Sequence, residues 1–249
     1  MAITIKNDKH MELMREAGKI NAKVLELMEQ NIKPGISTKA LDKIAFDFIK
    51  SNDATPSFKG YGGFPATICA SVNNQLIHGI PSDIILKEGD IISIDVGTYK
   101  NGFHADAART FAVGNISNEA KKLIDVTKQS FFEGIKFAKV GYYLYDISAA
   151  IQKYIEDNGF SVVRDYVGHG IGKQLHEDPQ IPNFRPFNKK GPKLIRGMAL
   201  AIEPMVNVGA KDIKVLQDGW TVVTKDGSLC AHYELSLIHI SEPTRLQLI

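Results

Sequence analysis

Residues 89–111 read GDIISIDVGTYKNGFHADAARTF, and this stretch decides the fold. Two runs rich in apolar residues flank Asn101-Gly102, a dipeptide typical of a two-residue β-hairpin turn. The stretch therefore predicts an antiparallel hairpin whose first strand includes residues 90–96. With Asn101-Gly102 as the loop, Lys100 faces Phe103 across the hairpin.

Two aspartates lie on one face of this predicted hairpin. Counting outward from the turn places Asp106 opposite Gly97, and Gly97 shares a face with Asp95 because side chains alternate along a strand. Asp95 and Asp106 are then diagonal neighbours, about 7 to 8 Å apart at the backbone. Two carboxylates this close repel each other unless a cation or a proton lies between them. Asp95 also ends the apolar run at residues 91–94, which argues against two solvated acids on an exposed edge.

The chain also contains an internal repeat. The pattern at residues 33–35 recurs at residues 139–141, and a Gly turn followed by an apolar strand and a carboxylate occurs both at residues 86–95 and at residues 194–203. Either match alone could arise by chance. Two matches in the same order predict two similar halves, each with helices followed by a hairpin.

The halves are expected to form one pseudo-symmetric α+β domain over residues 1–234, with a join near residues 117–122 and parts at about residues 1–118 and 119–234. Apolar residues three and four apart predict its first helices. One begins at Asn7 or Asp8 and ends at 33–35, and the next begins at Ser37-Thr38; an irregular loop at 53–65 and a strand at 67–72 follow.

The second half supplies further carboxylates for the same site. Glu203 ends the repeated strand in that half. Asp226-Gly227 predicts a second hairpin, with residues 220–224 leading in and residues 228–234 leading out. Glu234, at the end of that hairpin, then joins the site from the second half.

A histidine between glycines, His169 in the stretch VGHGIG, offers a neutral imidazole for a metal. One imidazole with several carboxylates suits a pair of divalent transition metals, which can share and activate a water when they lie about 3.5 to 4 Å apart. His78 and His176 lie in turns marked by Gly or Pro, and their positions alone leave open whether they belong to the site or are only polar loop residues. The remaining histidines are interpreted as structural or exposed: His10, His104, His232 and His239.

Composition indicates an ordinary globular protein. The chain has 249 residues, a formal net charge of +2 and a mean hydropathy of −0.11, which argues against a nucleic acid or an anionic membrane as its main partner. Cys69 and Cys230 lie far apart without a CxxC spacing, which favours buried, reduced thiols. With no apolar run long enough to span a bilayer and no secretory signal pattern, we expect a cytoplasmic protein.

Several stretches together resemble type I methionine aminopeptidases. They are SVNNQLIHGIP, GDIISIDVG, GFHADAARTF, GHGIGKQLHEDP, MALAIEPM and DGWTVVTKDGS, and the resemblance runs from Met11 to Glu234. It implies the pita-bread fold, a pseudo-two-fold pair of helix-plus-β-hairpin halves around a central antiparallel sheet. The chain is similar to the short bacterial form, since we see neither the zinc-binding extension of eukaryotic type I enzymes nor the insertion of type II.

The resemblance also implies the chemistry. Two divalent metals would be held by Asp95, Asp106, His169, Glu203 and Glu234, and a metal-activated water would attack the scissile carbonyl of a nascent chain that bears an N-terminal methionine. Glu203 would also move the proton, while His176 would stabilise the oxyanion and His78 would contact the amide nitrogen. The methionine pocket would be formed by Tyr61, Phe64, Cys69, Leu175 and Trp220. Cobalt, manganese, iron and zinc all suit such a site.

Some positions depart from the family pattern. Gly62 stands where some relatives have a histidine, and Leu175 stands where an aromatic residue is frequent. Residues 235–249 form an atypical tail that looks like foreign sequence, because the family usually continues after the last glutamate with His and Thr or Ser. If the tail is foreign, we expect a destabilised protein or one that binds metal weakly.

Alternatives remain at this point. A proline-directed peptidase or creatinase-like hydrolase keeps a similar set of residues but usually carries a large N-terminal domain. A non-catalytic pita-bread binding module would have lost one or more ligands. A mononuclear carboxylate enzyme of unrelated fold requires the repeat to be chance. We expect a monomer, with ribosome association as a possible further contact and with neither a membrane nor a specific nucleic acid as a partner.

Overall fold

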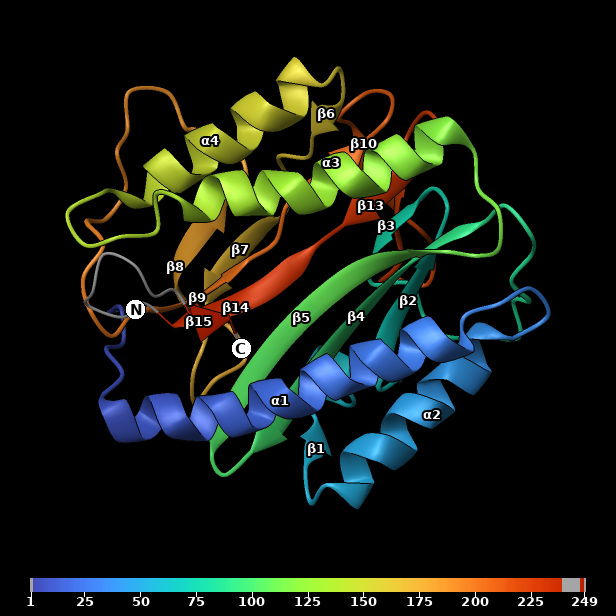
Figure 1. The fold of residues 1–249 in the computed structure, drawn as a ribbon, viewed down its shortest axis with the longest axis horizontal. Coiled ribbons are helices and arrows are strands. Elements are labelled where there is room, and N and C mark those ends of the chain that lie inside the picture. Colours follow the sequence, from blue (N-terminus) through green and yellow to red (C-terminus); the bar gives the residue numbers. More distant parts are fainter. Residues whose placement is uncertain (1, 239–246, 249) are drawn as a thin grey trace.

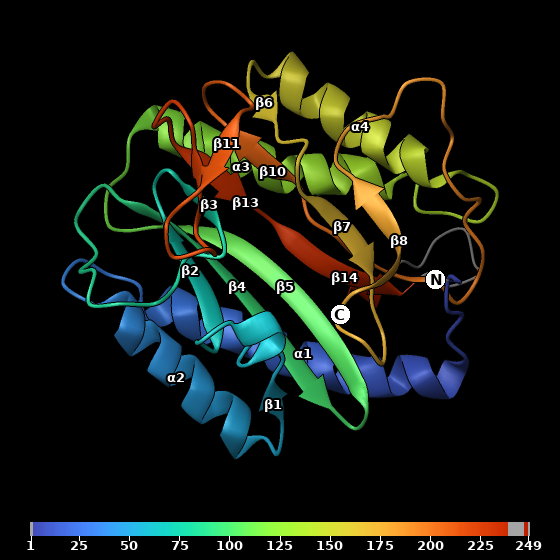
Figure 2. The same cartoon turned by 180° about the vertical axis from the view of Figure 1, so that it is seen from behind.

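Helices lie over one face of a large β-sheet in the computed structural model, which describes residues 2–238 and 247–248 (Figure 1; Figure 2 shows the other face). The helices form two pairs. The first pair is α1 (Asp8–Asn31) with α2 (Thr38–Ser51), and the second is α3 (Asn118–Ile135) with α4 (Leu144–Asp157). None of the described helices is long and apolar enough to cross a membrane.

The large sheet has the order β1-β4-β5-β14-β9-β7-β8, with β2 paired to β4 and β15 paired to β14. Its strands are antiparallel in every pair. They are β1 (Thr55–Pro56), β2 (Ile68–Val72), β4 (Ile91–Lys100), β5 (Phe103–Ala112), β7 (Val167–Gly170), β8 (Glu177–Pro182), β9 (Ala199–Ile202), β14 (Glu234–Ile238) and β15 (Gln247–Leu248).

Two small sheets complete the described fold. One has the order β13-β10-β6 and the other has the order β11-β12-β3. Their strands are β3 (Gln75–Ile77), β6 (Ser161–Val162), β10 (Met205–Asn207), β11 (Ile213–Val215), β12 (Val222–Thr224) and β13 (Cys230–His232). The predicted irregular loop at residues 53–65 contains the short strand β1 and a 3₁₀ turn, η1 (Tyr61–Gly63).

The helix starts follow the sequence signals. The side chain of Asn7 accepts a hydrogen bond from the backbone N–H of His10 (2.9 Å), and Ser37 caps α2 through Ala40 in the same way (3.1 Å). Ser117, at the predicted join, caps α3 through Ala120. Such caps satisfy N–H groups that have no partner within the helix.

The repeat is visible as matched backbone contacts in the two halves of the chain. An isolated bridge joins Ser37 to Ile85, and another joins Tyr143 to Lys193. The turn glycines of the two repeats, Gly89 and Gly197, have φ values of 90° and 89°. At these positions, residues that correspond in the sequence have similar local geometry.

The hairpin at residues 89–111 forms with the predicted register. Lys100 pairs with Phe103, and Gly97 pairs with Asp106. Asn101 and Gly102 have φ values of 51° and 87°; the left-handed region that both occupy is required at both positions of a type I′ turn. The turn therefore fixes which side chains of β4 and β5 face the same side.

The prediction that residues 220–224 and 228–234 pair as a second hairpin is wrong. Gly227 does adopt a turn, with φ of 77°, but β12 pairs with β3 and β11 while β13 pairs with β10. The reason lies in the turn at Asn73-Asn74: the N–H of Thr224 donates to Asn74 O (3.0 Å) and the N–H of Cys230 donates to Asn73 O (3.1 Å). The two arms separate around this turn and enter different sheets.

The first residues of the atypical tail continue the central strand. Leu235 pairs with Ile202 on one side and with Ala107 on the other, and Ser236 is fully buried. Glu234 is therefore followed by sheet structure as far as Ile238. Residues 239–246 and 249 lie outside the described residues, and so does His239.

Candidate active site

A cavity of about 150 Å³ brings together every residue predicted for the site. It is lined by Phe58, Tyr61, Phe64, Cys69, His78, Asp95, Asp106, His169, Leu175, His176, Glu203, Trp220 and Glu234. We call the part lined by the carboxylates and His169 the acidic end, and the part lined by apolar and aromatic side chains the apolar end. Phe58 is the residue that sequence reasoning missed, because it lies in an irregular loop with no periodic pattern to mark it.

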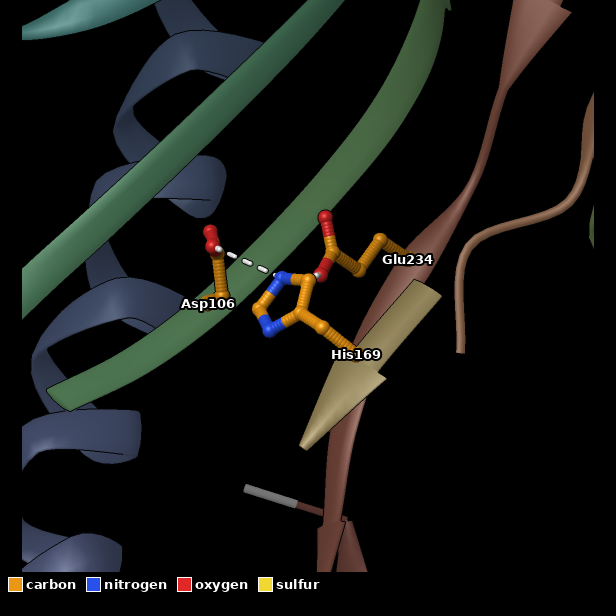
Figure 3. Close-up of side chains that lie close together, drawn as sticks. All are labelled: Asp106, His169 and Glu234. Atoms are coloured by element: carbon orange, nitrogen blue, oxygen red, sulfur yellow. Dashed lines mark ion pairs between the residues drawn. The ribbon is translucent and has the colours of Figure 1, made fainter. Parts of the chain in front are cut away.

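The acidic end is assembled from several strands of the large sheet. Asp106 comes from β5, His169 from β7 and Glu234 from β14, and their side chains point toward one another (Figure 3). His169 Nε2 lies 3.9 Å from Asp106 Oδ2 and 4.0 Å from Glu234 Oε1. Glu203 follows β9 directly, and its Oε1 lies 3.7 Å from the same nitrogen.

Backbone packing places His169. A Cβ on Gly168 would lie 2.3 Å from Ala201 O, and a Cβ on Gly170 would lie 2.1 Å from Asp178 O. Neither position has room for a side chain, so the glycines let β7 pack closely between β8 and β9. His169 Nδ1 lies 2.8 Å from Gly170 O; assigned as an N–H donor there, it leaves Nε2 free to face the carboxylates.

Enclosure of several acids in one cavity changes their protonation. Burial raises the pKa of Asp95 to about 7, although hydrogen bonds with Asp106 and with the Val96 N–H oppose the change. Burial, followed by repulsion from neighbouring carboxylates, raises the pKa of Asp106, Glu203 and Glu234 well above the usual range. Burial also lowers the pKa of His169 to about 3, so its imidazole is neutral and can bind a cation.

The acidic end fits divalent cations. Asp95 Oδ1, Asp106 Oδ1 and Glu234 Oε1 are buried without a hydrogen-bond partner. Buried carboxylate oxygens are costly unless they are paired or bind a metal. Ligand atoms of Asp106, His169 and Glu234 all lie within 4.8 Å of one another, and oxygens with an imidazole nitrogen are the donors that manganese, iron, cobalt and zinc accept.

The apolar end is built from aromatic and sulfur-containing side chains. Phe64 and Trp220 pack edge to face, with their ring centroids 5.2 Å apart. Cys69 on β2 pairs with Asp95 on β4, so the thiol lies next to the acidic end. Leu175 is 2% exposed.

His78 and His176 lie on the wall of the cavity and not merely in polar loops. His176 Nδ1 is 2.7 Å from the hydroxyl of Tyr61, and its ring centroid is 4.3 Å from that of His169. His78 packs edge to face on Trp220. Burial lowers the pKa of His78 to about 4 and also lowers the pKa of His176, so both are neutral at pH 7.

His232, interpreted from the sequence as structural or exposed, is buried behind the acidic end. Its Nε2 lies 3.8 Å from Glu203 Oε2 and 3.9 Å from Glu234 Oε2. Burial lowers its pKa to about 3. Its position two residues before Glu234 was the one signal that could have drawn attention to it.

Comparisons with known proteins show the family and the fold of the chain. The model of metallopeptidase family M24 matches residues 12–234. Methionine aminopeptidase of Clostridium perfringens is 61% identical over 233 residues, which is 93% of each chain. The crystal structure of methionine aminopeptidase from Rickettsia prowazekii superposes with a TM-score of 0.96 at 39% identity and covers 99% of each chain.

The chain is also similar in structure to a protein with much lower sequence identity. Prolidase from Pyrococcus furiosus has a TM-score of 0.79 at 20% identity, and the match covers 98% of this chain but 64% of that one. This likeness shows the shared fold alone. The resemblance to methionine aminopeptidases and the α+β pita-bread fold predicted from the sequence are both confirmed.

Proposed function

The chain belongs to metallopeptidase family M24, and on that premise we propose that it removes the N-terminal methionine from newly made polypeptides by metal-dependent hydrolysis. The observation that carries the proposal is one cavity that joins an acidic, imidazole-containing end to an apolar end. Relatives named methionine aminopeptidase, similar to this chain over nearly its whole length, support the same reading.

Two divalent ions would be held by Asp95, Asp106, His169, Glu203 and Glu234. When bound, such ions lower the pKa of a water and polarise the scissile carbonyl. Manganese, iron, cobalt and zinc are all compatible with these donors, and availability rather than affinity often decides between them.

Three side chains would handle the proton and the peptide group. Glu203 would accept the proton of the attacking water and deliver it to the leaving amine, as a positioned carboxyl with a raised pKa can do. His176 would donate to the developing oxyanion. His78, which packs on Trp220, would contact the amide nitrogen of the bond that breaks.

The apolar end would select methionine. Tyr61, Phe64, Cys69, Leu175 and Trp220 offer apolar and polarizable surface to an unbranched thioether. The likeness to methionine aminopeptidases implies that a small second residue is preferred, and a preference for bulky second residues would argue against this substrate.

The remaining assignments are parts of the same proposal. Residues 1–234 would act as one catalytic domain of two related halves, about 1–118 and 119–234, with an atypical tail at 235–249. The protein would work as a monomer in the cytoplasm on nascent chains, with ribosome association as a further contact. A proline-directed peptidase and a binding module are the alternatives that the following experiment separates.

The test is release of free methionine from a Met-Ala-Ser peptide. Protein stripped with a chelator is assayed with manganese or cobalt added back, beside Glu203→Ala and with a Pro-containing dipeptide as a second substrate. Glu133→Ala, a change of the same type on the helix surface, is the control. We expect metal-dependent release that Glu203→Ala abolishes and Glu133→Ala retains.

Two results would contradict the proposal. Cleavage of the Pro-containing dipeptide in preference to the methionyl peptide would indicate a proline-directed enzyme. Absence of release with each metal, from protein that calorimetry shows to be folded and metal-loaded, would indicate a binding module.

A further inference from the structure

His232 is a buried histidine whose imidazole has no hydrogen-bond partner. It is 2% exposed, and neither Nδ1 nor Nε2 bonds to another group. A buried polar group left in this way costs roughly 1–3 kcal/mol. The nearest acceptors are Glu203 Oε2 at 3.8 Å and Glu234 Oε2 at 3.9 Å, and both face the same ring nitrogen.

The two glutamates lie between two imidazoles. On one side their Oε1 atoms face His169 Nε2, at 3.7 Å and 4.0 Å. On the other side their Oε2 atoms face His232 Nε2. His169, Glu203 and Glu234 line the cavity, whereas His232 does not. The carboxylates therefore present one oxygen to the cavity and the other to His232.

The backbone of His232 is held firmly. The hydroxyl of Thr110 on β5 accepts from the His232 N–H (3.0 Å) and donates to the His232 carbonyl (2.9 Å). Since that hydroxyl has a single proton, Ser93 Oγ must be the donor in its 2.8 Å contact with Thr110. The backbone of His232 is thus fixed by β5, independently of the glutamates that its imidazole faces.

From this arrangement we propose that His232 is a positioning residue for the metal centre, whose Nε2–H donates a hydrogen bond to Oε2 of Glu203 and keeps Oε1 of Glu203 turned toward the metals. The torsion that turns a Glu carboxyl group is soft, so a small rotation shortens the 3.8 Å separation to hydrogen-bond length. Carboxylates that bind a metal through one oxygen commonly accept such a bond on the other. The inference rests on the metal centre of the proposed function.

The experiment compares His232→Gln, which keeps an N–H donor of similar reach, with His232→Asn, whose amide is too short to reach Glu203. Cys230→Val, two residues earlier on the same buried strand, is the control for packing. Mn²⁺ affinity is measured by calorimetry, and the cobalt forms are compared by visible absorption. Unfolding in the presence of chelator shows that each variant is folded.

We expect His232→Asn to bind Mn²⁺ about 10- to 100-fold more weakly and to shift the cobalt absorption bands. His232→Gln and Cys230→Val should stay close to the wild type in both measurements. Equal affinities and spectra for the Asn variant and the wild type would overturn the proposal, and so would equal losses in the Gln and Asn variants.

X-ray absorption of the cobalt protein separates positioning from direct ligation. One imidazole per metal pair, from His169, is expected. A second imidazole that disappears in His232→Gln would show His232 to be a ligand and would overturn the positioning role. Because these readouts need no peptide cleavage, a protein that bound metal as expected but released no methionine would contradict the proposed function and leave this inference standing.

Discussion

Asp95 shows how the burial of a single side chain makes the stability of the fold depend on pH. Its pKa is raised from 3.8 to about 7 because the cavity removes the carboxyl group from water. A group whose pKa is higher in the folded state stabilises the fold below its unfolded pKa and loses that contribution as the pH rises through the folded value. The neighbouring acids with raised pKa values act in the same direction.

We therefore expect metal-free protein to lose stability as the pH rises from 6.5 to 8. The site histidines oppose this change only weakly, because their lowered pKa values keep them neutral in the folded state and most of them are also neutral in the unfolded state above pH 7. Each carboxyl group that is protonated in the folded state and ionised in the unfolded state lowers the free energy of unfolding by up to ~1.4 kcal/mol per pH unit. Urea unfolding in chelator at several pH values measures the effect.

The same series in excess Mn²⁺ is the control for this pH dependence. A bound cation favours the ionised carboxylates, so the loss between pH 6.5 and 8 should disappear. Metal-free protein that became more stable across this range would contradict the raised carboxyl pKa values.

Ser236 offers a second prediction at this scale. Its buried hydroxyl donates to Asp106 O (2.9 Å) and accepts from the Asp106 N–H (3.1 Å), so it holds the backbone of a proposed ligand. Ser236→Ala should cost about 1–3 kcal/mol and weaken Mn²⁺ binding. Ser148→Ala is the matched control, because that buried hydroxyl has no partner and its loss should be close to neutral. Equal effects of the two changes on unfolding and calorimetry would argue against this role for Ser236.

Strand β7 and the β4–β5 hairpin both depend on glycine, for different reasons. Gly102 has φ of 87° with open space around a Cβ, whereas a Cβ on Gly170 would meet the backbone of Asp178. The first glycine provides a turn conformation and the second provides room between strands. Their replacement should have different consequences.

We expect Gly102→Ala to cost about 1–2 kcal/mol, the penalty of a left-handed residue, with Mn²⁺ affinity retained. Gly170→Ala should cost more and should also weaken Mn²⁺ binding, because β7 must shift and carry His169 away from the carboxylates. Denaturant unfolding and calorimetry on both variants check this. If Gly170→Ala bound Mn²⁺ like the wild type, close packing of β7 would not be what places His169.

Elements set by local signals could be predicted from the sequence, and those set by distant partners could not. Asn101-Gly102 dictates its own turn, so the register of β4 and β5, and with it the relation of Asp95 to Asp106, followed from counting residues. Asp226-Gly227 gave an equally clear turn signal. The pairing predicted from it was wrong because the Asn73-Asn74 turn, far away in the sequence, separates the two arms.

The site residues also divide into those marked by local sequence signals and those placed by distant parts of the chain. The proposed metal ligands and the cavity histidines lie in strands, strand ends and Gly-marked turns that the sequence displays, and the resemblance added the proposed methionine pocket. Phe58 lies in a loop without periodicity, and the place of His232 depends on how β13 meets β5 and comes close to Glu203. Neither position could be assigned without the assembled sheet.

At the scale of the whole molecule, the site joins the two halves. Asp95 and Asp106 come from the first half, and His169, Glu203 and Glu234 come from the second. The central strand β14 pairs with β5 of the first half and with β9 of the second. Neither half can complete the site or the sheet without the other.

Thermal unfolding should accordingly be a single cooperative transition, and metal should shift all of it. A free Mn²⁺ concentration of about 100 times the dissociation constant adds about 2.7 kcal/mol to the free energy of unfolding. Scanning calorimetry with and without Mn²⁺ provides the measurement. Two resolved transitions, of which only one responded to metal, would show that the halves are stabilised independently.

The place of β14 also sets an order of events during synthesis. This strand follows all the others of the large sheet except β15 along the chain, yet it lies between β5 and β9. While the polypeptide is still emerging, the edges of β5 and β9 remain open, and open edges favour wrong pairing with other chains. The cavity therefore stays incomplete until β14 has been made, and the open edges of β5 and β9 need protection from other chains until then.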